Sequence, residues 1–77
     1  MPMYEVRSGH PQEPENVTIH ARVESRTQAY LWAKYSESAS LPALSEFKDK
    51  DDFLENGMPL LLEWLRDRKM YLIESNL

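Results

Sequence analysis

The side chains of this 77-residue sequence form no recognisable catalytic motif. Histidine is the side chain that ordinarily titrates near neutral pH, and the chain holds only His10 and His20. His10 precedes a proline in a turn-rich stretch and His20 takes a polar position in an alternating segment, so we interpret both as surface residues. Gly9 and Gly57 are the only glycines, which excludes a glycine-rich phosphate-binding loop. We therefore expect a protein that is not an enzyme and binds no cofactor.

Three carboxylates, at Asp49, Asp51 and Asp52, have the spacing that opens a calcium-binding loop. Such a loop also needs glycine at its sixth position and glutamate at its twelfth, and Leu54 and Leu60 stand there. Acidic residues at the start of a helix instead cap free N–H groups and suit the positive end of the helix dipole. We therefore expect no metal site, and the absence of cysteine also excludes disulfides and thiolate ligands.

A mixture of aromatic and cationic side chains is the strongest candidate for a binding surface. Arg22 lies in an alternating segment, and Tyr30, Trp32 and Lys34 follow a few residues later. If the two segments pair as a hairpin, these side chains share its outward face. Trp, Tyr and Arg dominate protein-binding hot spots, and aromatic rings beside cations also stack nucleic-acid bases. The alternative is that Trp32 packs in the core, as a helical second segment would require.

Acidic residues gather in the second half of the chain, where Glu46, Asp49, Asp51, Asp52 and Glu55 stand against two lysines. One interpretation is a solvated helix face. The functional interpretation is a contact for a basic surface on a larger protein, where charge raises the association rate and the selectivity. The formal net charge of −4 disfavours direct, sequence-independent binding of nucleic acid.

Alternation of apolar and polar residues predicts the strands. Val17–Glu24 alternates strictly and predicts a strand with one buried face. Met3–Arg7 alternates more weakly and predicts a short strand, and the proline-rich Ser8–Asn16 predicts a loop. Gln28–Ser36 fits either a strand or a helix that begins with a capping box at Ser25. We favour the strand, because a hairpin partner would satisfy the edge of the preceding strand.

The C-terminal half carries the helical signal, with Asp49 as a candidate N-cap. Gly57 and Pro59 interrupt this half, since glycine commonly ends helices and proline commonly begins them. We expect two helices, at 50–56 and 59–68, or one helix kinked at Pro59. Their apolar stripe has helical spacing and consists of Leu54, Met58, Leu61, Leu62 and Leu65.

A last strand at Met70–Glu74 completes the expected fold. The fold class is α+β: a small antiparallel sheet of three to four strands with C-terminal helical segments packed on one face, in a single domain spanning 1–77. No apolar run approaches the length of a membrane span, and the first residues, Met1–Glu5, lack the basic head and apolar middle typical of an export signal. We therefore expect a cytoplasmic protein that does not bind membranes. An exposed strand edge can also pair two copies in a homodimer.

Part of the C-terminal half resembles a known family. Leu41-Pro42-Ala43-Leu44, Phe47-Lys48-Asp49 and Asp52-Phe53-Leu54-Glu55-Asn56 resemble the stretch that enters the helix in HicB-type antitoxins. Ala43 departs from that family's usual glycine, and Pro59 falls within its helix. In type, a small acidic chain without cysteine or a catalytic motif is also similar to phage-encoded inhibitors, including anti-CRISPR proteins.

These features predict a non-enzymatic, acidic protein-binding module that regulates or inhibits a larger protein, such as one that handles nucleic acid. The alternative is an antitoxin-like domain that binds RNA or single-stranded nucleic acid through an aromatic sheet face. The candidate contact residues are Arg22, Tyr30, Trp32, Lys34, Asp49, Asp51, Asp52 and Glu55.

Overall fold

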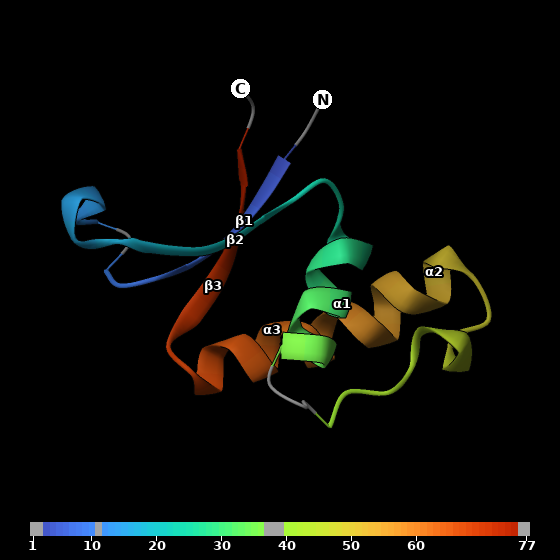
Figure 1. The fold of residues 1–77 in the computed structure, drawn as a ribbon. Coiled ribbons are helices and arrows are strands. Elements are labelled where there is room, and N and C mark those ends of the chain that lie inside the picture. The colour runs from blue at the N-terminus through green and yellow to red at the C-terminus, as the bar shows by residue number, and fades with distance from the viewer. Residues whose placement is uncertain (1–2, 11, 37–39, 76–77) are drawn as a thin grey trace.

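Strand β1 (Met3–Ser8) lies at the centre of a three-stranded antiparallel sheet, between β2 (Thr18–Val23) and β3 (Met70–Ser75). The structure is a computed structural model, and it describes residues 3–10, 12–36 and 40–75. Figure 1 shows the helices packed to one side of this sheet. The antiparallel α+β fold expected from the sequence is therefore confirmed, as are the strands at both ends of the chain.

The segment that follows β2 is helix α1 (Arg26–Ser36), so the strand predicted over 28–36 is wrong. The Ser25 Oγ accepts a hydrogen bond from the Gln28 backbone N–H at 3.1 Å. The Gln28 side chain accepts one from the Glu24 N–H at 2.7 Å. Both bonds satisfy free N–H groups where the helix begins. Strand β2 needs no hairpin partner from this segment, because β1 already pairs with it.

The C-terminal helix runs without a break through the predicted interruption. Helix α2 (Lys50–Asp52), a π-helical turn (Phe53–Gly57) and helix α3 (Met58–Asp67) follow one another directly. Of the two expected arrangements, two helices divided at Gly57 is therefore wrong, and the structure has the single helix of the other alternative. Proline has no N–H to donate, and the wider π turn just before α3 lets the chain stay helical as it enters Pro59. The predicted N-cap is confirmed, since the Asp49 side chain accepts from the Asp52 N–H at 2.8 Å.

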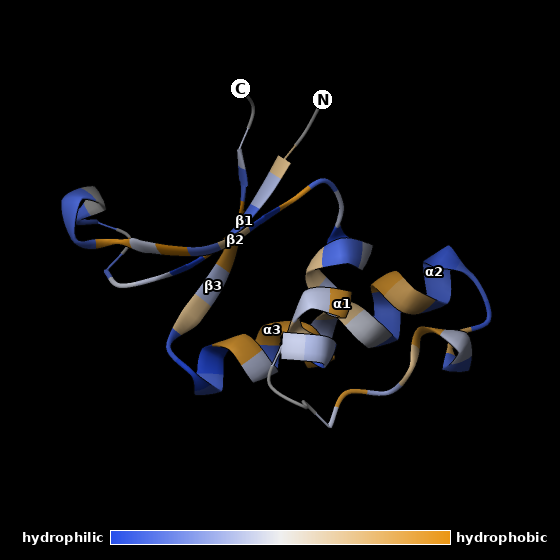
Figure 2. Cartoon of the chain, in the orientation of Figure 1, coloured by the Kyte–Doolittle hydropathy of each residue, from blue (hydrophilic) through white to orange (hydrophobic). Residues whose placement is uncertain are grey.

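The core lies between the helices and one face of the sheet. The central strand contributes Val6 and the first residue of β3 contributes Met70, and both are buried. Helix α3 contributes Met58, Leu61 and Leu65, which confirms most of the predicted apolar stripe, whereas Leu62 is 43% exposed. Figure 2 shows hydrophobic residues on α3 and also on the strands. The fully buried residues of α1 are Ala29, Tyr30 and Ala33.

Three aromatic rings fix the helices relative to the loop before α2. Tyr30 of α1 meets Phe53 and Phe47 edge to face, with ring centroids 5.3 and 6.0 Å apart. The two phenylalanine rings lie 5.7 Å apart in a similar arrangement. Edge-to-face pairs add stability beyond the area they bury. Gly57 lies directly against these rings.

Within the described ranges, no helix combines the length and the apolar character that crossing a membrane requires.

Candidate functional site

The aromatic and cationic residues predicted to share one sheet face are dispersed in the structure. Tyr30 is fully buried, and its hydroxyl donates a hydrogen bond to the Pro42 carbonyl. Lys34 donates to the Leu41 carbonyl at 2.9 Å. Because both residues lie on α1 rather than on a strand, they do not join Arg22 on a sheet surface. The predicted hairpin, which would have placed these residues on one face, is therefore wrong. Instead, the side chains of Tyr30 and Lys34 bind the backbone at Pro42 and Leu41, after α1.

Trp32 is neither fully exposed, as a surface role predicts, nor fully buried, as the core alternative predicts. It is half-buried, and its ring meets Trp64 of α3 at 6.3 Å with the planes nearly perpendicular. The Arg68 guanidinium stacks over the Trp64 ring at 4.1 Å from the centroid. The indole N–H of Trp64 is buried and has no hydrogen-bond partner among the described residues. The tryptophan pair mainly joins α1 to α3.

Two of the four acidic residues predicted as a contact surface have local structural roles. Asp49 caps the C-terminal helix. Asp52 accepts from the Lys48 N–H at 2.8 Å and from the Asn56 side chain at 2.6 Å. These donors lower the pKa of Asp52, the backbone hydrogen bond from Lys48 contributing most. Asp51 and Glu55 remain exposed. The acidic stretch is thus largely a helix start, and its role as a contact surface stays a prediction.

The face of the sheet turned away from the helices forms a regular grid. Residues directly opposite each other in antiparallel strands point to the same side. One row across the sheet consists of Arg22, Glu5 and Ile73, and the next consists of Ile19, Arg7 and Tyr71. We call these six residues the outer face.

Glu5 is the centre of the outer face and is only 5% exposed, although no helix covers it. Arg7 donates two hydrogen bonds to its Oε1, from Nε at 3.0 Å and from Nη2. Arg22 donates from Nε to the other carboxylate oxygen at 2.9 Å. These bonds, that from Arg7 first, lower the pKa of Glu5, and the same carboxylate raises the pKa of Arg7. The carboxylate is therefore ionised near neutral pH, and it holds both guanidinium groups in place.

Arg22 presents the rest of its guanidinium to solvent. Its side chain is 63% exposed, and its Nη atoms have no hydrogen-bond partner in the described part of the chain. Arginine loses less freedom on binding when its planar group is already oriented. A fixed, exposed arginine is the type of side chain that dominates protein-binding hot spots. Arg22 therefore has oriented, exposed Nη donors that could bind a carboxylate of another molecule.

Two large aliphatic side chains are exposed on the same face as this arginine. Ile19 is 41% exposed and Ile73 is 39% exposed, on the two edge strands. The strict alternation of 17–24 predicted Ile19 for the core, and this is wrong. The register shifts between Val6 and Arg7, so that β2 carries one extra residue there and Ile19 pairs with Arg7. A bulge re-aims the side chains beyond it, and this one turns Ile19 outward.

Sequence reasoning found Arg22 but missed the rest of the outer face. One signal was available, because Glu5 and Arg7 are two residues apart in a predicted strand and must share a face. The bulge and the β1–β3 pairing depend on contacts that are distant in the sequence, so Ile19 and Ile73 gave no local signal.

The two histidines do not assemble a catalytic constellation within the described residues. His20 shares a hydrogen bond of 2.7 Å with the Ser8 hydroxyl; Ser8 ends the β1–β2 ladder, and His20 is the residue of β2 without a pairing partner at the register shift. His10 Nδ1 accepts from the Gln12 N–H at 3.3 Å in the following turn. No group of three or more potential metal ligands comes together in the part of the chain that the structure describes.

Comparison of the chain with protein families, curated proteins and solved structures finds no match in any of the three. The resemblance to HicB-type antitoxins and to phage-encoded inhibitors therefore rests only on the residues and the composition of the chain.

Proposed function

We propose that this chain is a non-enzymatic protein-binding module whose partner docks on the outer face. The observation that carries the proposal is Arg22, which Glu5 orients through its Nε while its Nη donors face solvent, on a sheet face that also exposes Ile19 and Ile73. An interface centre combines an oriented charged anchor with apolar surroundings that exclude water. The outer face has this composition.

The chemistry of the outer face specifies the partner surface. Two arginines and one glutamate leave the face with one net positive charge, although the whole chain carries −4. A matching surface presents a carboxylate to Arg22 and apolar side chains to the two isoleucines. We infer a larger cytoplasmic protein that is regulated or inhibited when this face covers it, in the manner of small phage-encoded inhibitors.

Direct binding of nucleic acid gains little from this geometry. Base stacking needs exposed aromatic rings on the sheet, and Tyr71 is the only aromatic residue that the described strands place on the outer face. Trp32 and Tyr30, which the alternative required there, lie on α1.

The test is a tagged pull-down from the source lysate with matched variants. Ile19→Ser removes an outer-face side chain that is 41% exposed, and Leu62→Ser removes a side chain of similar exposure, 43%, on α3. Arg22→Ala is matched in the same way by Arg66→Ala, an exposed arginine of α3. A stoichiometric partner should be retained by wild type and both α3 variants, and lost by both outer-face variants.

The partner contact at Arg22 should weaken as salt rises, because exposed charge pairs are screened. A partner that both outer-face variants retain at wild-type levels contradicts the proposed docking face. Recovery of the bait alone, or of nucleic acid alone, contradicts the proposed function. Size-exclusion chromatography tests whether the chain forms a dimer. A dimer that Ile19→Ser abolishes would show that the outer face binds a second copy of the chain.

A further inference from the structure

A separate hollow lies on the side of the sheet that carries the helices. Its volume is about 260 Å³, and residues from β1, α1 and the start of the C-terminal helix line it. Ligand sites of drug-sized molecules usually span about 300–1,000 Å³, so this hollow suits a smaller group. Its lining includes no residue of the outer face, so a ligand bound there is independent of the proposed docking surface.

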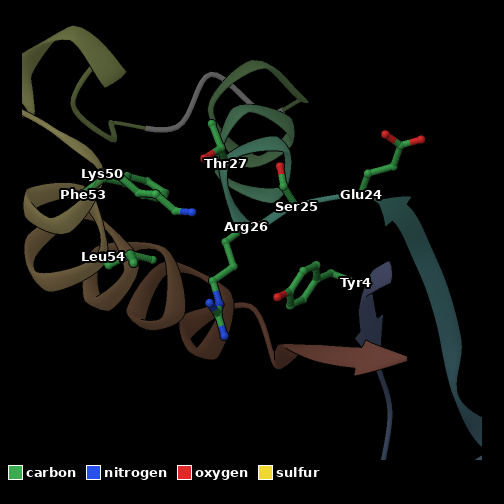
Figure 3. A pocket seen from close by; sticks show the side chains of 8 residues that line it. All are labelled: Tyr4, Glu24, Ser25, Arg26, Thr27, Lys50, Phe53 and Leu54. Carbon is green, nitrogen blue, oxygen red and sulfur yellow. The ribbon is translucent and has the colours of Figure 1, made fainter. Parts of the chain in front are cut away.

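Two cations from different elements meet at this hollow. Figure 3 shows the Arg26 guanidinium of α1 and the Lys50 ammonium of α2 directed into it, while the Glu24 carboxylate points away. Both cations are exposed, and neither forms an ion pair with a described residue. Among the residues that line the hollow, these two cations outnumber the single carboxylate of Glu24.

The remaining walls are aromatic and apolar. Tyr4 of β1 supports Arg26, whose guanidinium carbon lies 5.4 Å from the ring centroid, within the range of a cation–π contact. Phe53 and Leu54 lie on the same helical segment as Lys50, across the hollow from Tyr4. The hollow therefore combines two cationic side chains with aromatic and apolar walls.

We propose that the hollow binds a phosphate monoester whose organic part is one ring or a short apolar group. A phosphate monoester carries between one and two negative charges at neutral pH, and this matches the two cations. The planar guanidinium of Arg26 donates to two phosphate oxygens, and Lys50 acts as a mobile point charge. The organic part lies against Tyr4, Phe53 and Leu54. The same chemistry occurs in a free small metabolite and in a phosphorylated aromatic side chain of a peptide.

The test is an NMR titration of the ¹⁵N-labelled chain at low salt. Phenyl phosphate is the probe, because it combines a phosphate monoester with one aromatic ring. Phenol has the ring alone, and inorganic phosphate has the anion alone. Phenyl phosphate should shift the amides of residues 25–27 and 50–54 most, and should bind more tightly than either half. A phosphotyrosine tetrapeptide and a hexose 6-phosphate, a free metabolite with one ring, then distinguish the two sources, and tighter binding than phenyl phosphate by either one supports the proposal.

Charge-removing variants complete the test. Arg26→Gln and Lys50→Gln should each weaken phenyl phosphate binding by roughly three- to tenfold, as expected for an exposed charged hydrogen bond. Arg66→Gln makes the same change in net charge on α3, away from the hollow, and should leave the affinity within about twofold, the spread expected of a screened distant charge. Because all three side chains are exposed, the variants should keep the wild-type spectrum outside the hollow.

Three results would overturn the proposal. The first is the absence of localised shifts at about 10 mM phenyl phosphate, a concentration far above that expected to half-saturate a site with two cationic anchors. The second is equal binding of phenol or of inorganic phosphate, which would show that one wall plays no part. The third is an equal loss of affinity in Arg66→Gln, which would indicate non-specific attraction to the whole chain.

Discussion

Gly57→Ala should destabilise the protein, although alanine is the better helix former. Gly57 has ordinary helical dihedral angles, φ −85° and ψ −45°, so glycine is not needed for its backbone freedom. It is needed for space. A Cβ at this position would lie 2.7 Å from Phe53 Cδ1 and 3.0 Å from Phe47 Cζ. Carbon atoms in contact prefer about 3.5–4.0 Å, so a buried ring would have to move.

Two opposing magnitudes decide the sign of this effect. Replacing glycine by alanine inside a helix gains about 1 kcal/mol, whereas overpacking a core costs about 1–3 kcal/mol. The ring of Phe53 is held edge-on by two other rings and is buried, so the cost should lie in the middle of its range. We expect a net loss of about 1 kcal/mol, which lowers Tm by about 4–8 °C for a domain of this size.

Urea denaturation followed by circular dichroism measures this loss, and a double-mutant cycle tests its cause. Phe53→Val removes the nearest ring atoms at a cost of about 2–4 kcal/mol, from a total stability of about 4–12 kcal/mol. In that background Gly57→Ala should become neutral or stabilising, giving a coupling energy of about 1 kcal/mol or more. If Gly57→Ala alone raises the free energy of unfolding of the wild-type protein by about 1 kcal/mol, the full gain in helix propensity, the steric reasoning is refuted.

Further predictions concern the buried tyrosine, the turn before β3 and the outer face. Tyr30→Phe removes the hydroxyl that donates to Pro42 and should cost about 1 kcal/mol in urea denaturation; an unchanged midpoint would show that this bond adds no net stability. Lys69 adopts φ +59° just after α3, where a side chain is strained, so Lys69→Gly should raise the free energy of unfolding by about 0.5–1 kcal/mol; a lower Tm would contradict this. The pKa of Glu5 is lowered from its ordinary value of 4.5 by Arg7 and Arg22, so its contribution to stability is complete above that value and is lost as the pH falls through the lower folded-state pKa. Glu5→Gln should therefore lose less stability than wild type between about pH 5 and pH 2.5, measured by thermal melts, and parallel curves would contradict the assignment.

Part of the architecture follows from local patterns alone. The weak alternation in Met3–Arg7, the apolar run in Met70–Glu74 and the cap at Asp49 use only neighbouring residues, and the structure confirms these elements. The spacing of Met58, Leu61 and Leu65 likewise places them on one buried helix face. In each case the physical cause acts within about one or two turns or pleats, so it can be read along the chain.

The identity of segment 26–36 shows where local patterns are insufficient. Its residues fit a strand with alternating alanine and leucine, or a helix with a capping serine. The structure decides for the helix because β1 occupies the inner edge of β2, and because the helix buries Ala29, Tyr30 and Ala33 together. Because the segment is a helix, Tyr30, Trp32 and Lys34 do not share one face of the sheet as predicted.

Local patterns thus specify the strands at the two ends of the chain, the start of the C-terminal helix and most of its buried face, since these depend on neighbours along the chain. Tertiary contacts alone decide the pairing order β2-β1-β3, the bulge that turns Ile19 outward and the burial of Glu5 beneath two arginines. Strand register and the cover over a carboxylate are set by residues far apart in the sequence. The free energy that favours a given register or buried ion pair arises only when folding brings those residues into contact.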